Sequence, residues 1–493
     1  MNLNFYKTLI LHLLAYAITF SCFAQNTMKL SLEETIAKAQ QQSPSFRLAK
    51  AKWTSSRSLL RATMADFKPQ ISLQGTLPEL QRSNLKNRLD NGEQVFLRSA
   101  SLGSALGLRM EQSIARTGGT VFLGTGLDYS YNFAIDGRDA SRQFASDLIY
   151  VGIEQPLFGF NSMKWQKELA PIQYAEATRR YAEEMESIAL QCARLFFDLY
   201  EAQLTLAASQ KQKSNADSLY EISKGRFSVG RIAETDLLQI ELSAMNARAT
   251  VAAEGLKKQR ATEALRNFLG IKDPVIFDLQ APTDLPSYLL DIDKAVQLAN
   301  NNRSKSYEFQ RRLLQSEREI AQVDGSTGLQ ANLFARVGLS QNAKDFADAY
   351  KKPEDAEFVT LGFQIPIADW GKAKARRNIA RSNYELERMN IEQEQINMEQ
   401  EIILRVQQFD LLRQQVALAL RAYEVSQKTE GITRKRYLIG KIDVTELNLS
   451  IQAMDAARKK YINALRAFWL AHYEIRALTL YDFVRGVSLV RGE

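Results

Sequence analysis

The chain has 493 residues, of which 45% are hydrophobic and 24% charged, and its formal net charge is +8. A chain of this size can bury a large core, either as one elongated fold or as two or three compact domains. Its basic and acidic residues are spread along the expected helices. The small positive excess therefore does not indicate nucleic-acid binding.

The first 24 residues have the pattern of a secretory signal peptide. Lys7 precedes a mostly apolar run from Leu9 to Phe20, and small residues follow up to Ala24. We expect cleavage after Ala24. Lipidation of Cys22 is the competing interpretation, but the residues before it lack the aliphatic side chain expected three positions upstream. No later stretch reaches the roughly 18 uninterrupted apolar residues of a membrane-spanning helix, so membrane insertion would use strands.

Few residues of the mature chain are suited to catalysis or metal binding. Cys192 and His472 are the single cysteine and histidine left after cleavage, which excludes an intrachain disulfide and a zinc cluster. Both lie on apolar helical seams and are expected in the core. No phosphate-binding glycine loop or clustered acid pair is present, so we expect neither an enzyme nor a cofactor.

Two segments near the middle and the end of the chain repeat each other. RFSVGRIAETDLLQ from Arg226 matches RYLIGKIDVTELNL from Arg436, 210 residues later. The strand-to-helix segments EQPLFGFNSMK and QIPIADWGKAK share this offset. They align Pro156 with Pro366 and Phe160 with Trp370. One constant offset indicates an internal duplication.

The beginnings of the two copies are further apart. LEETIAKAQQQ from Leu32 matches IDKAVQLANNN from Ile292, and PQISLQG from Pro69 matches LQANLFA from Leu329, both at an offset of 260. The difference between the offsets predicts 50 extra residues in the first copy, between its first strand and its return strand.

Helical patterns dominate both copies. About 60 residues run from Ser162 to Lys224 and again from Gly371 to Glu430, each ~90 Å long as a helix. Four shorter patterns of about 35 residues would each span ~53 Å, so two placed end to end match one long helix. They lie near 31–66, which is interrupted near Pro44, and near 234–269, 291–325 and 444–478.

The long helices carry heptad seams, typical of helices packed side by side. The second long helix has two seams, so we expect neighbours on two of its sides, as in a wall. A plain coiled coil is the alternative, but it leaves the strand segments unexplained. The seams are Ile188, Cys192, Leu195, Leu199, Ala202 and Leu206; Ile402, Val406, Phe409, Arg413, Val416, Leu420 and Tyr423; and Leu404, Leu411, Leu418 and Val425.

The strand segments alternate between apolar and polar residues. This period is typical of a membrane barrel with lipid outside and water inside, although a soluble sandwich has it too. The aromatic content of the apolar side and the export signal favour the membrane, where the sheet must close because open edges cannot lie in lipid. One face has Val121, Leu123, Leu127, Tyr129, Tyr131 and Phe133; the other has Gly124, Gly126, Asp128, Ser130 and Asn132.

Together these features resemble the TolC-like outer-membrane efflux protein family, whose members serve tripartite efflux pumps and type I secretion systems. The resemblance rests on SLEETIAKAQQQSPSF, on QPLF and IPIADWGKAKA, and on the two RxxxG segments, and it covers nearly the whole mature chain. It implies a mainly α fold with β-strands. Long antiparallel coiled-coil-like helices would form a periplasmic α-barrel, and transmembrane strands of a homotrimer would share one β-barrel in outer-membrane lipid.

The resemblance also implies a function and a domain order. The function is a passive exit duct, opened by a periplasmic membrane-fusion adaptor and driven by an inner-membrane pump. A non-conducting coiled-coil structural or adhesive envelope protein is the alternative. The expected order is a signal peptide at 1–24, a first repeat at 25–270, an equatorial connector at 271–290, a second repeat at 291–478 and a tail at 479–493.

In the family, the two glycine tips are the adaptor-docking end, and acidic residues after the second tip line the aperture. Here the matching gate residues are Glu446 and Thr445, with Asp236 in the first copy. Ile442 and Leu449 depart from the family, since a basic and a second acidic residue can stand there. The expected docking residues are Arg226, Gly230, Arg231, Arg436, Gly440 and Lys441, beside the basic Arg434 and Lys435. Both glycines also suit helix ends that need positive φ.

Two further features have open interpretations. Trp165 and Trp370 follow strands, where they would lie at the membrane interface or pack on the next helix. The extra residues contain SALGLRMEQSIARTGGTVFLGTG, a hairpin signal with its turn at Gly118-Gly119. With loops at 79–100 and 135–146 outside, the hairpin would give six barrel strands per protomer in place of the family's four. Otherwise it forms an extracellular extension or a plug.

Overall fold

The computed structural model describes residues 26–490 except 89–91, 93, 136–138, 283 and 287. The predicted signal peptide and Cys22 lie outside these residues. The chain divides into two compact units, which we call the core unit and the sheet unit. Of the described residues, the core unit comprises those within 26–51, 180–303 and 399–490, and the sheet unit comprises those within 52–179 and 304–398.

The two longest helices match the prediction and exceed its length. Helices α4 (Ser162–Ser228) and α8 (Lys372–Leu438) have 67 residues each, about 100 Å at 1.5 Å per residue. Helices α5 (Glu234–Leu269) and α9 (Val444–Thr479) have 36 residues each, within two residues of the expected ends. Among the helices of the described residues, none is both long and apolar enough to cross a membrane.

Each copy begins with a broken pair of helices. The first pair is α2 (Leu32–Gln42) and α3 (Pro44–Ala65), separated as expected at Ser43, whose extended backbone suits the residue before a proline. The second pair is α6 (Ile292–Asn302) and α7 (Ser304–Thr327). Arg303 between them has the same extended backbone without a following proline, which the sequence pattern did not predict.

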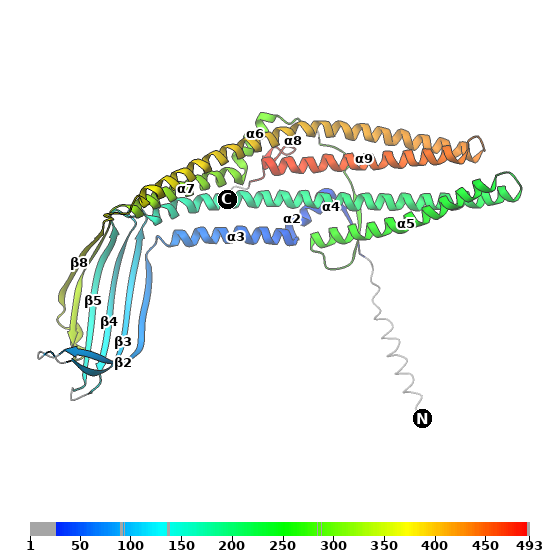
Figure 1. Cartoon of the computed structure of the whole chain (residues 1–493). Helices are drawn as coiled ribbons and strands as arrows, with labels where there is room; N and C mark the ends of the chain where they lie inside the picture. Colours follow the sequence, from blue (N-terminus) through cyan, green and yellow to red (C-terminus); the bar gives the residue numbers. More distant parts are fainter. Residues whose placement is uncertain are drawn as a thin grey trace, which may run out of the picture. The chain divides into compact units, whose positions relative to one another are not determined.

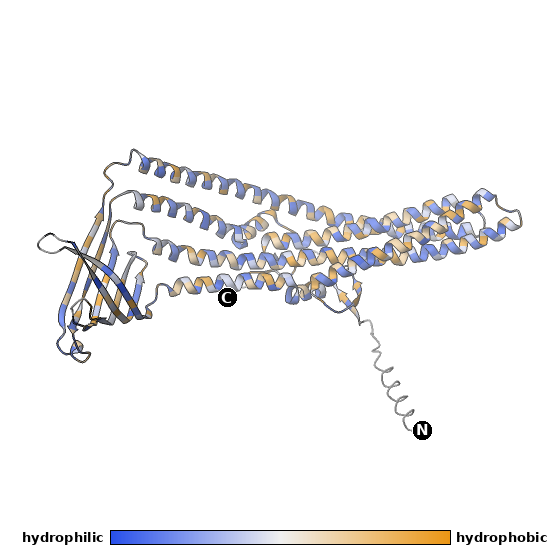
Figure 2. Ribbon diagram, turned by 60° about the horizontal axis from the view of Figure 1, so that its bottom comes forward, coloured by the Kyte–Doolittle hydropathy of each residue, from blue (hydrophilic) through white to orange (hydrophobic). Residues whose placement is uncertain are grey.

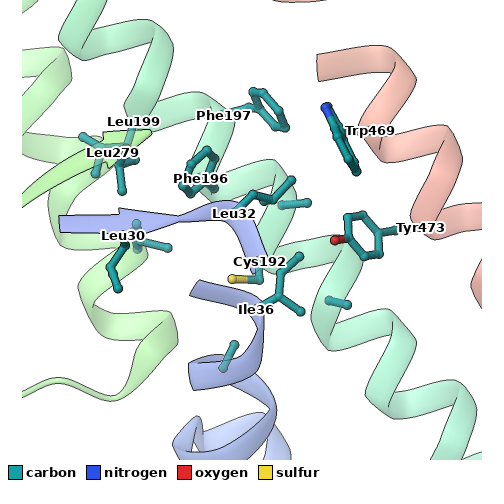
Figure 3. Packing of buried hydrophobic residues seen from close by; sticks show 14 of the residues in the cluster. Leu30, Leu32, Ile36, Cys192, Phe196, Phe197, Leu199, Leu279, Trp469 and Tyr473 are labelled. Carbon is teal, nitrogen blue, oxygen red and sulfur yellow. The ribbon is translucent and has the colours of Figure 1, made fainter. Parts of the chain in front are cut away.

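The core unit is built around apolar side chains from several helices and a short sheet (Figure 3). Cys192 and Leu199 of the predicted α4 seam are fully buried, and the ring of Phe409 on α8 packs against that of Phe468 on α9, with ring centroids 5.0 Å apart. Removal of one such phenylalanine side chain costs roughly 3–5 kcal/mol of stability. The predicted α4 seam and the first predicted α8 seam therefore contribute to the core, whereas the second α8 seam is exposed.

A parallel two-stranded sheet in the core unit was not predicted. Strand β1 (Asn26–Ser31) pairs with β6 (Val275–Gln280), so the expected connector at 271–290 contains a strand. Leu30 and Leu279 of these strands belong to the buried core. The C-terminal residues after α9 also form a small hairpin, β9 (Tyr481–Asp482) with β10 (Val487–Ser488).

Within the core unit, the 36-residue helices end beside the breaks in the helix pairs. Gly270, which ends α5 with φ 71°, packs against Pro44: a Cβ on Gly270 would lie 3.2 Å from Cδ of Pro44. In the second copy, the Asn302 side-chain amide donates a hydrogen bond to the carbonyl oxygen of Thr479 at 3.1 Å. These contacts agree with the end-to-end arrangement expected from helix lengths.

The sheet unit contains one antiparallel sheet of six strands in the order β2-β3-β4-β5-β7-β8 (Figure 1). Because neighbouring strands alternate in direction, the four connections to α3, α4, α7 and α8 lie at one end of the sheet. The short 3₁₀ helix η1 (Asp348–Tyr350) lies between β7 and β8. The strands are β2 (Gln70–Arg88), β3 (Gln94–Ile114), β4 (Gly119–Asn132), β5 (Ser141–Pro156), β7 (Gln330–Ala343) and β8 (Glu354–Gln364).

The predicted hairpin turn is confirmed, and its strands join the main sheet. Gly118 has a φ of 77°, and β3 and β4 pair on either side of residues 115–118. The loop expected at 79–100 was wrong, since β2 continues through a bulge to Arg88, and β5 already begins inside the loop expected at 135–146.

The structure also revises which strands of the two copies correspond. Residues 210 positions before β7 and β8 fall on β4 and β5, which form the equivalent hairpin. Strands β2 and β3 are therefore the inserted pair. The sequence match of Pro69 with Leu329 therefore does not pair equivalent strands, and both residues simply lie in the first strand after a helix.

Ion pairs join the helices of the sheet unit. Arg312 on α7 contacts both Glu387 and Glu394 on α8, with a Glu394 distance of 2.8 Å, and Lys305 reaches the same Glu394 at 2.8 Å. Arg311 on α7 pairs with Glu176 on α4 at 2.6 Å. Partly exposed networks of this kind hold their geometry better than isolated pairs.

His472 is buried in the core unit, as its position on an apolar seam predicted. Its Nδ1 lies 2.8 Å from the hydroxyl oxygen of Tyr288, and 3% of the residue is exposed. Burial lowers the pKa of His472 to about 4, Arg476 adds to this shift, and Asp482 opposes it. The neutral imidazole is therefore the form that the fold accepts. Burial also raises the pKa of the Cys192 thiol to about 12, which makes it unreactive.

We predict a loss of stability on acidification that depends on His472. Its folded pKa is below the unfolded value of about 6.5, so the unfolded chain binds more protons between the two values. The stabilisation of the folded chain by the neutral His472 is fully present above pH ~6.5. The free energy of unfolding then falls by on the order of 3 kcal/mol as the pH approaches ~4.

The measurement is the thermal unfolding midpoint of the detergent-solubilised chain between pH 7 and pH 4, for wild type and His472→Gln. The carboxylates titrate in both proteins, so the difference between the two plots of midpoint against pH isolates the effect of the histidine. Parallel curves would contradict the prediction.

Candidate functional site

One face of the sheet is apolar across neighbouring strands. A cross-strand row contains Ile71, Met110, Leu123, Val151 and Val337, from β2, β3, β4, β5 and β7. Ile71 is 68% exposed, and Val151 and Val337 are each 47% exposed. Hydrophobic and hydrophilic residues alternate along the strands in Figure 2. The described residues of the sheet unit therefore leave a wide apolar surface uncovered.

Aromatic side chains gather at the end of this sheet away from the helices. Tyr129 and Phe144 are cross-strand partners with ring centroids 4.9 Å apart, and Phe346 contacts both Phe144 and Tyr350. The predicted aromatic positions on β4 are thus part of a larger group. Aromatic groups at the border of an apolar band are typical of membrane interfaces.

The opposite face is polar except for a group of aromatic rings, Phe122, Tyr150, Phe334 and Phe358. Phe122 lies on this face and is buried because its ring covers Gly152, where a side chain would collide with it. The Arg109 guanidinium lies 4.2 Å from the centroid of the Phe122 ring and pairs with Glu111 at 3.2 Å. The glycines of this face make room for a flat ring and a stacked cation, which period-2 reasoning alone did not predict.

The two edges of the sheet are β2 and β8, and both carry exposed apolar residues. Leu73 on β2 is 68% exposed, and Val359 and Phe363 on β8 are 70% and 72% exposed. Strands β2 and β8 run in opposite directions, because they are the first and the sixth strands of a sheet in which each strand is antiparallel to its neighbour. Edge β2 of one copy can therefore pair in antiparallel fashion with edge β8 of another.

The strand-to-helix junctions are where the sequence predicted them. Pro156 ends β5, and Pro366 and Trp370 lie between β8 and α8. Trp370 is 98% exposed with a φ of 54°, so it packs on no helix of the described chain. Asp369 caps α8, since its carboxylate accepts a hydrogen bond from the backbone N–H of Ala373 at 2.7 Å.

Both helical tips use the same turn, as the repeat predicted. Gly230 and Gly440 have φ values of 67° and 74°. In each tip the residue after the glycine donates a backbone hydrogen bond five residues back, to Arg226 at 2.9 Å and to Arg436 at 3.0 Å. This pattern is a Schellman motif, in which positive φ at the glycine lets the last helical carbonyls find donors.

The tips differ in how their return helices begin. Asp443 caps α9 by accepting a hydrogen bond from the Glu446 backbone N–H at 2.8 Å, whereas Ala233 before α5 provides no side-chain cap. Glu446 and Arg436 lie 3.9 Å apart with more than half of each side chain exposed. Such an exposed pair contributes little, so both groups remain available to solvent. The other predicted tip residues Arg231, Asp236, Lys441 and Thr445 are also exposed.

One tip contact was missed from the sequence. The Arg226 guanidinium lies 6.0 Å from the ring centroid of Tyr437, which is 5% exposed, so the ends of α4 and α8 touch. Tyr437 stands where the first copy has Phe227. The repeat showed that an aromatic residue stands at this position, but it did not predict that the tips of the two repeats are in contact.

Apolar stripes on two helices of the core unit remain exposed. The second predicted seam of α8 continues with one residue every seven to Ile439, the residue directly after the helix, and its members are 48–71% exposed. On α5, Leu238, Leu242 and Met245 are 54–58% exposed. Heptad seams of this kind are normally covered by another helix. The α8 stripe is Leu404, Leu411, Leu418, Val425, Ile432 and Ile439.

A fold of two long-helix repeats joined to an antiparallel sheet, with an apolar face and open edges, is that of an outer-membrane channel subunit. The family model for outer membrane efflux proteins matches residues 126–271 and 329–479. The chain belongs to this family. The two matched segments also confirm the internal duplication, and the first begins in β4, after the inserted pair of strands.

Solved outer-membrane channels have the same fold. CmeC of Campylobacter jejuni has a TM-score of 0.66 at 14% identity, covering 91% of this chain and 85% of that chain. VceC of Vibrio cholerae has a TM-score of 0.62 at 15% identity, covering 91% and 96%. The open state of MtrE of Neisseria gonorrhoeae has a TM-score of 0.60 at 15% identity, covering 91% and 88%. No curated protein sequence matched the chain.

We predict that Gly230→Ala and Gly440→Ala each destabilise the chain by about 1 kcal/mol, because alanine is strained at positive φ. A Cβ at either position would meet no atom within 4 Å, so crowding is not the cause. Gly431→Ala in the interior of α8 is the matched control. It has the same open surroundings without positive φ and should stabilise by roughly 0.5–1 kcal/mol.

The readout is the thermal midpoint of the helical circular dichroism signal in detergent. If all three variants shifted in the same direction, the conformational argument for the tips would fail.

Proposed function

We propose that three copies of this chain form an exit duct in the outer membrane. The observation that carries the proposal is the six-stranded sheet with one apolar face, one polar face and two open edges. In lipid, each unpaired backbone group costs several kcal/mol, so such a sheet must close on further copies. Related structures support a channel: CusC undergoes conformational changes that accompany transmembrane channel formation, and MtrE is an outer-membrane channel solved in its open state.

The sheet geometry supports closure between copies. Strands β2 and β8 run in opposite directions, so each copy offers the next an antiparallel partner. Three six-stranded sheets would give eighteen strands, and barrels of about 16–18 strands enclose an aqueous channel. The apolar row from Ile71 to Val337 would then face lipid and the polar face would line the water-filled interior. The aromatic group around Phe144 would lie at the outer membrane interface.

The exposed helical stripes support the same assembly. The α8 stripe from Leu404 to Ile439 and the α5 stripe around Leu242 lie on different helices. The α8 stripe of one copy could pack against the α5 stripe of the next copy. Such a contact joins two different surfaces, and contacts of this kind can close into rings. Three copies would then form a helical tunnel in the periplasm.

The tips are the end at which we place the partners. The docking surface for a periplasmic adaptor would be formed by the basic residues Arg231, Arg436 and Lys441 around the two glycine turns. An inner-membrane pump, or a type I secretion transporter, would supply the energy. Three copies of Glu446 would narrow the duct as a ring of negative charge, with Thr445 and Asp236 beside it. The exposure of these side chains supports this role.

We predict that cysteines at Leu73 and Leu361, on the two edge strands, will cross-link one copy to the next. A short bis-maleimide added to membranes should convert the double variant to a species of three times the chain mass on a denaturing gel. Leu73→Cys with Val151→Cys is the matched control, because Val151 lies inside the sheet on β5 and should give no trimer. The native Cys192 is buried and should not react.

The same preparations are tested for conductance in planar lipid bilayers. Stable ion-conducting steps from the wild type are the expected result. A chain without conductance would be a structural scaffold of the envelope, and the proposal would be wrong.

We predict that Glu446→Gln will reduce the preference of the open duct for cations, because it removes three negative charges from the aperture. Reversal potentials in a salt gradient measure this preference, and we expect a shift of several millivolts toward zero. Glu401→Gln, which removes an exposed carboxylate from the middle of α8, should leave the reversal potential unchanged. If both variants had the same reversal potential, Glu446 would not be the residue that sets the cation preference.

A further inference from the structure

A connected group of aromatic rings crosses the polar face of the sheet. Phe122, Tyr150, Phe334 and Phe358 lie on β4, β5, β7 and β8, and we call them the polar-face rings. The Phe122 centroid lies 6.1 Å from that of Tyr150 and 5.7 Å from that of Phe334, and Phe334 and Phe358 are 5.8 Å apart. A water-facing surface does not require such rings. Contiguous aromatic surface within a polar rim is typical of ligand-binding sites.

Two arginines of the chain already stack on these rings. The Arg109 guanidinium lies 4.2 Å from the centroid of Phe122, and the Arg336 guanidinium lies 3.9 Å from the centroid of Tyr150. The face of an aromatic ring carries partial negative charge and attracts cations. The polar-face rings therefore form a surface that accepts planar cations.

The carboxylates near the rings outnumber the arginines. Glu111 pairs with Arg109 at 3.2 Å, and Asp147 pairs with Arg336. Both guanidinium charges are thus balanced. Glu154 is exposed and has no ion-pair partner among the described residues. It leaves this part of the face with a surplus negative charge.

Glu154 lies beside the two rings on which no arginine is stacked. Glu154 on β5 is the cross-strand partner of Phe334 on β7, and Phe334 is the partner of Thr360 on β8. Directly opposite residues have Cβ atoms about 5 Å apart, so the carboxylate is a close neighbour of the Phe334 ring. Phe358 contacts Phe334 from the other side and is 58% exposed.

Closure of the sheet between copies would leave these rings uncovered. In the proposed duct, β8 of one copy meets β2 of the next. On the polar face, β2 carries Gln70, Ser72 and Gln74, which pair with residues of β3 on the same side as Arg109. These polar side chains add no apolar cover to Phe358.

We propose that Phe334, Phe358 and Glu154 form a binding site for aromatic cations on the water-facing side of the duct. The rings supply the stacking surface, and the carboxylate supplies the opposite charge. The inference rests on the proposed function, which places this face inside the channel. It names flat organic cations as a class of cargo, since a hydrated metal ion would not use the rings and an aromatic anion would be repelled by Glu154.

The test measures binding of 1-methylquinolinium, a flat aromatic cation, to the full chain in detergent. Equilibrium dialysis with the same detergent on both sides gives the dissociation constant. Phe334→Leu with Phe358→Leu should raise this constant about tenfold, because leucine keeps an apolar side chain but has no aromatic face. The matched control is Phe144→Leu with Phe363→Leu, which makes the same change on the apolar face and should bind like wild type.

Glu154→Gln tests the charge separately from the rings. Glu154 is exposed, so its replacement leaves the packing of the sheet intact and gives a result even where the double leucine variant fails to fold. We expect about threefold weaker binding at low salt and a smaller difference at 1 M salt, where the charge is screened.

Two further probes separate the contributions of ring and charge. Tetraethylammonium has the charge without a ring, and naphthalene-1-sulfonate has the rings with a negative charge. Both should bind the wild type at least about tenfold more weakly than 1-methylquinolinium. Equal binding of either probe would overturn the proposal, as would wild-type binding of 1-methylquinolinium by the double leucine variant or by Glu154→Gln at low salt.

Conductance of each preparation in planar bilayers separates this site from the duct. A conducting wild type whose binding of 1-methylquinolinium is insensitive to these substitutions would overturn the site alone. A wild type that binds the probe through these residues but does not conduct would overturn the proposed duct and, with it, the assignment of a cargo.

Discussion

Backbone hydrogen bonding at the two edges of the sheet constrains the rest of this structure. Strands β2 and β8 each have one side without a neighbour among the described strands, and both carry exposed apolar side chains. Water can satisfy such edges, but lipid cannot. The apolar face therefore requires lipid and the edges require further strands. The proposed closure between copies would meet both requirements, and it would give the exposed helical stripes the same neighbours.

The core unit buries only part of its apolar surface within one chain. The α4 seam and the first α8 seam contribute to one buried core, and the parallel pair β1 and β6 adds Leu30 and Leu279 to it. The unpaired stripe on α8 runs along the same helix as the buried seam that contains Phe409. One helix thus carries both an intramolecular and an unsatisfied surface, as expected for a wall built from several copies.

Periodicity predicted the features that extend over many residues. The ends of α5 and α9, the break at Pro44 and the positive φ of Gly118, Gly230 and Gly440 followed from heptads, proline and glycine. The short strand β6, the break at Arg303 and the ring of Phe122 over Gly152 did not, because each depends on a partner distant in the sequence. For the same reason the glycine turns of the tips and the α8 stripe were predicted from the sequence, whereas the α5 stripe and the Tyr437 contact were not.

The inserted strands also limit how a protein of this kind can evolve. A hairpin returns the chain to the side from which it left, so β2 and β3 entered the first copy without reversing the exit of α4. A single added strand would have sent that helix out of the opposite end of the sheet. The perimeter of the sheet can therefore grow only by an even number of strands in each copy. Because strands are added in pairs, the number of strands in the sheet can change without changing the end of the sheet from which the helices leave.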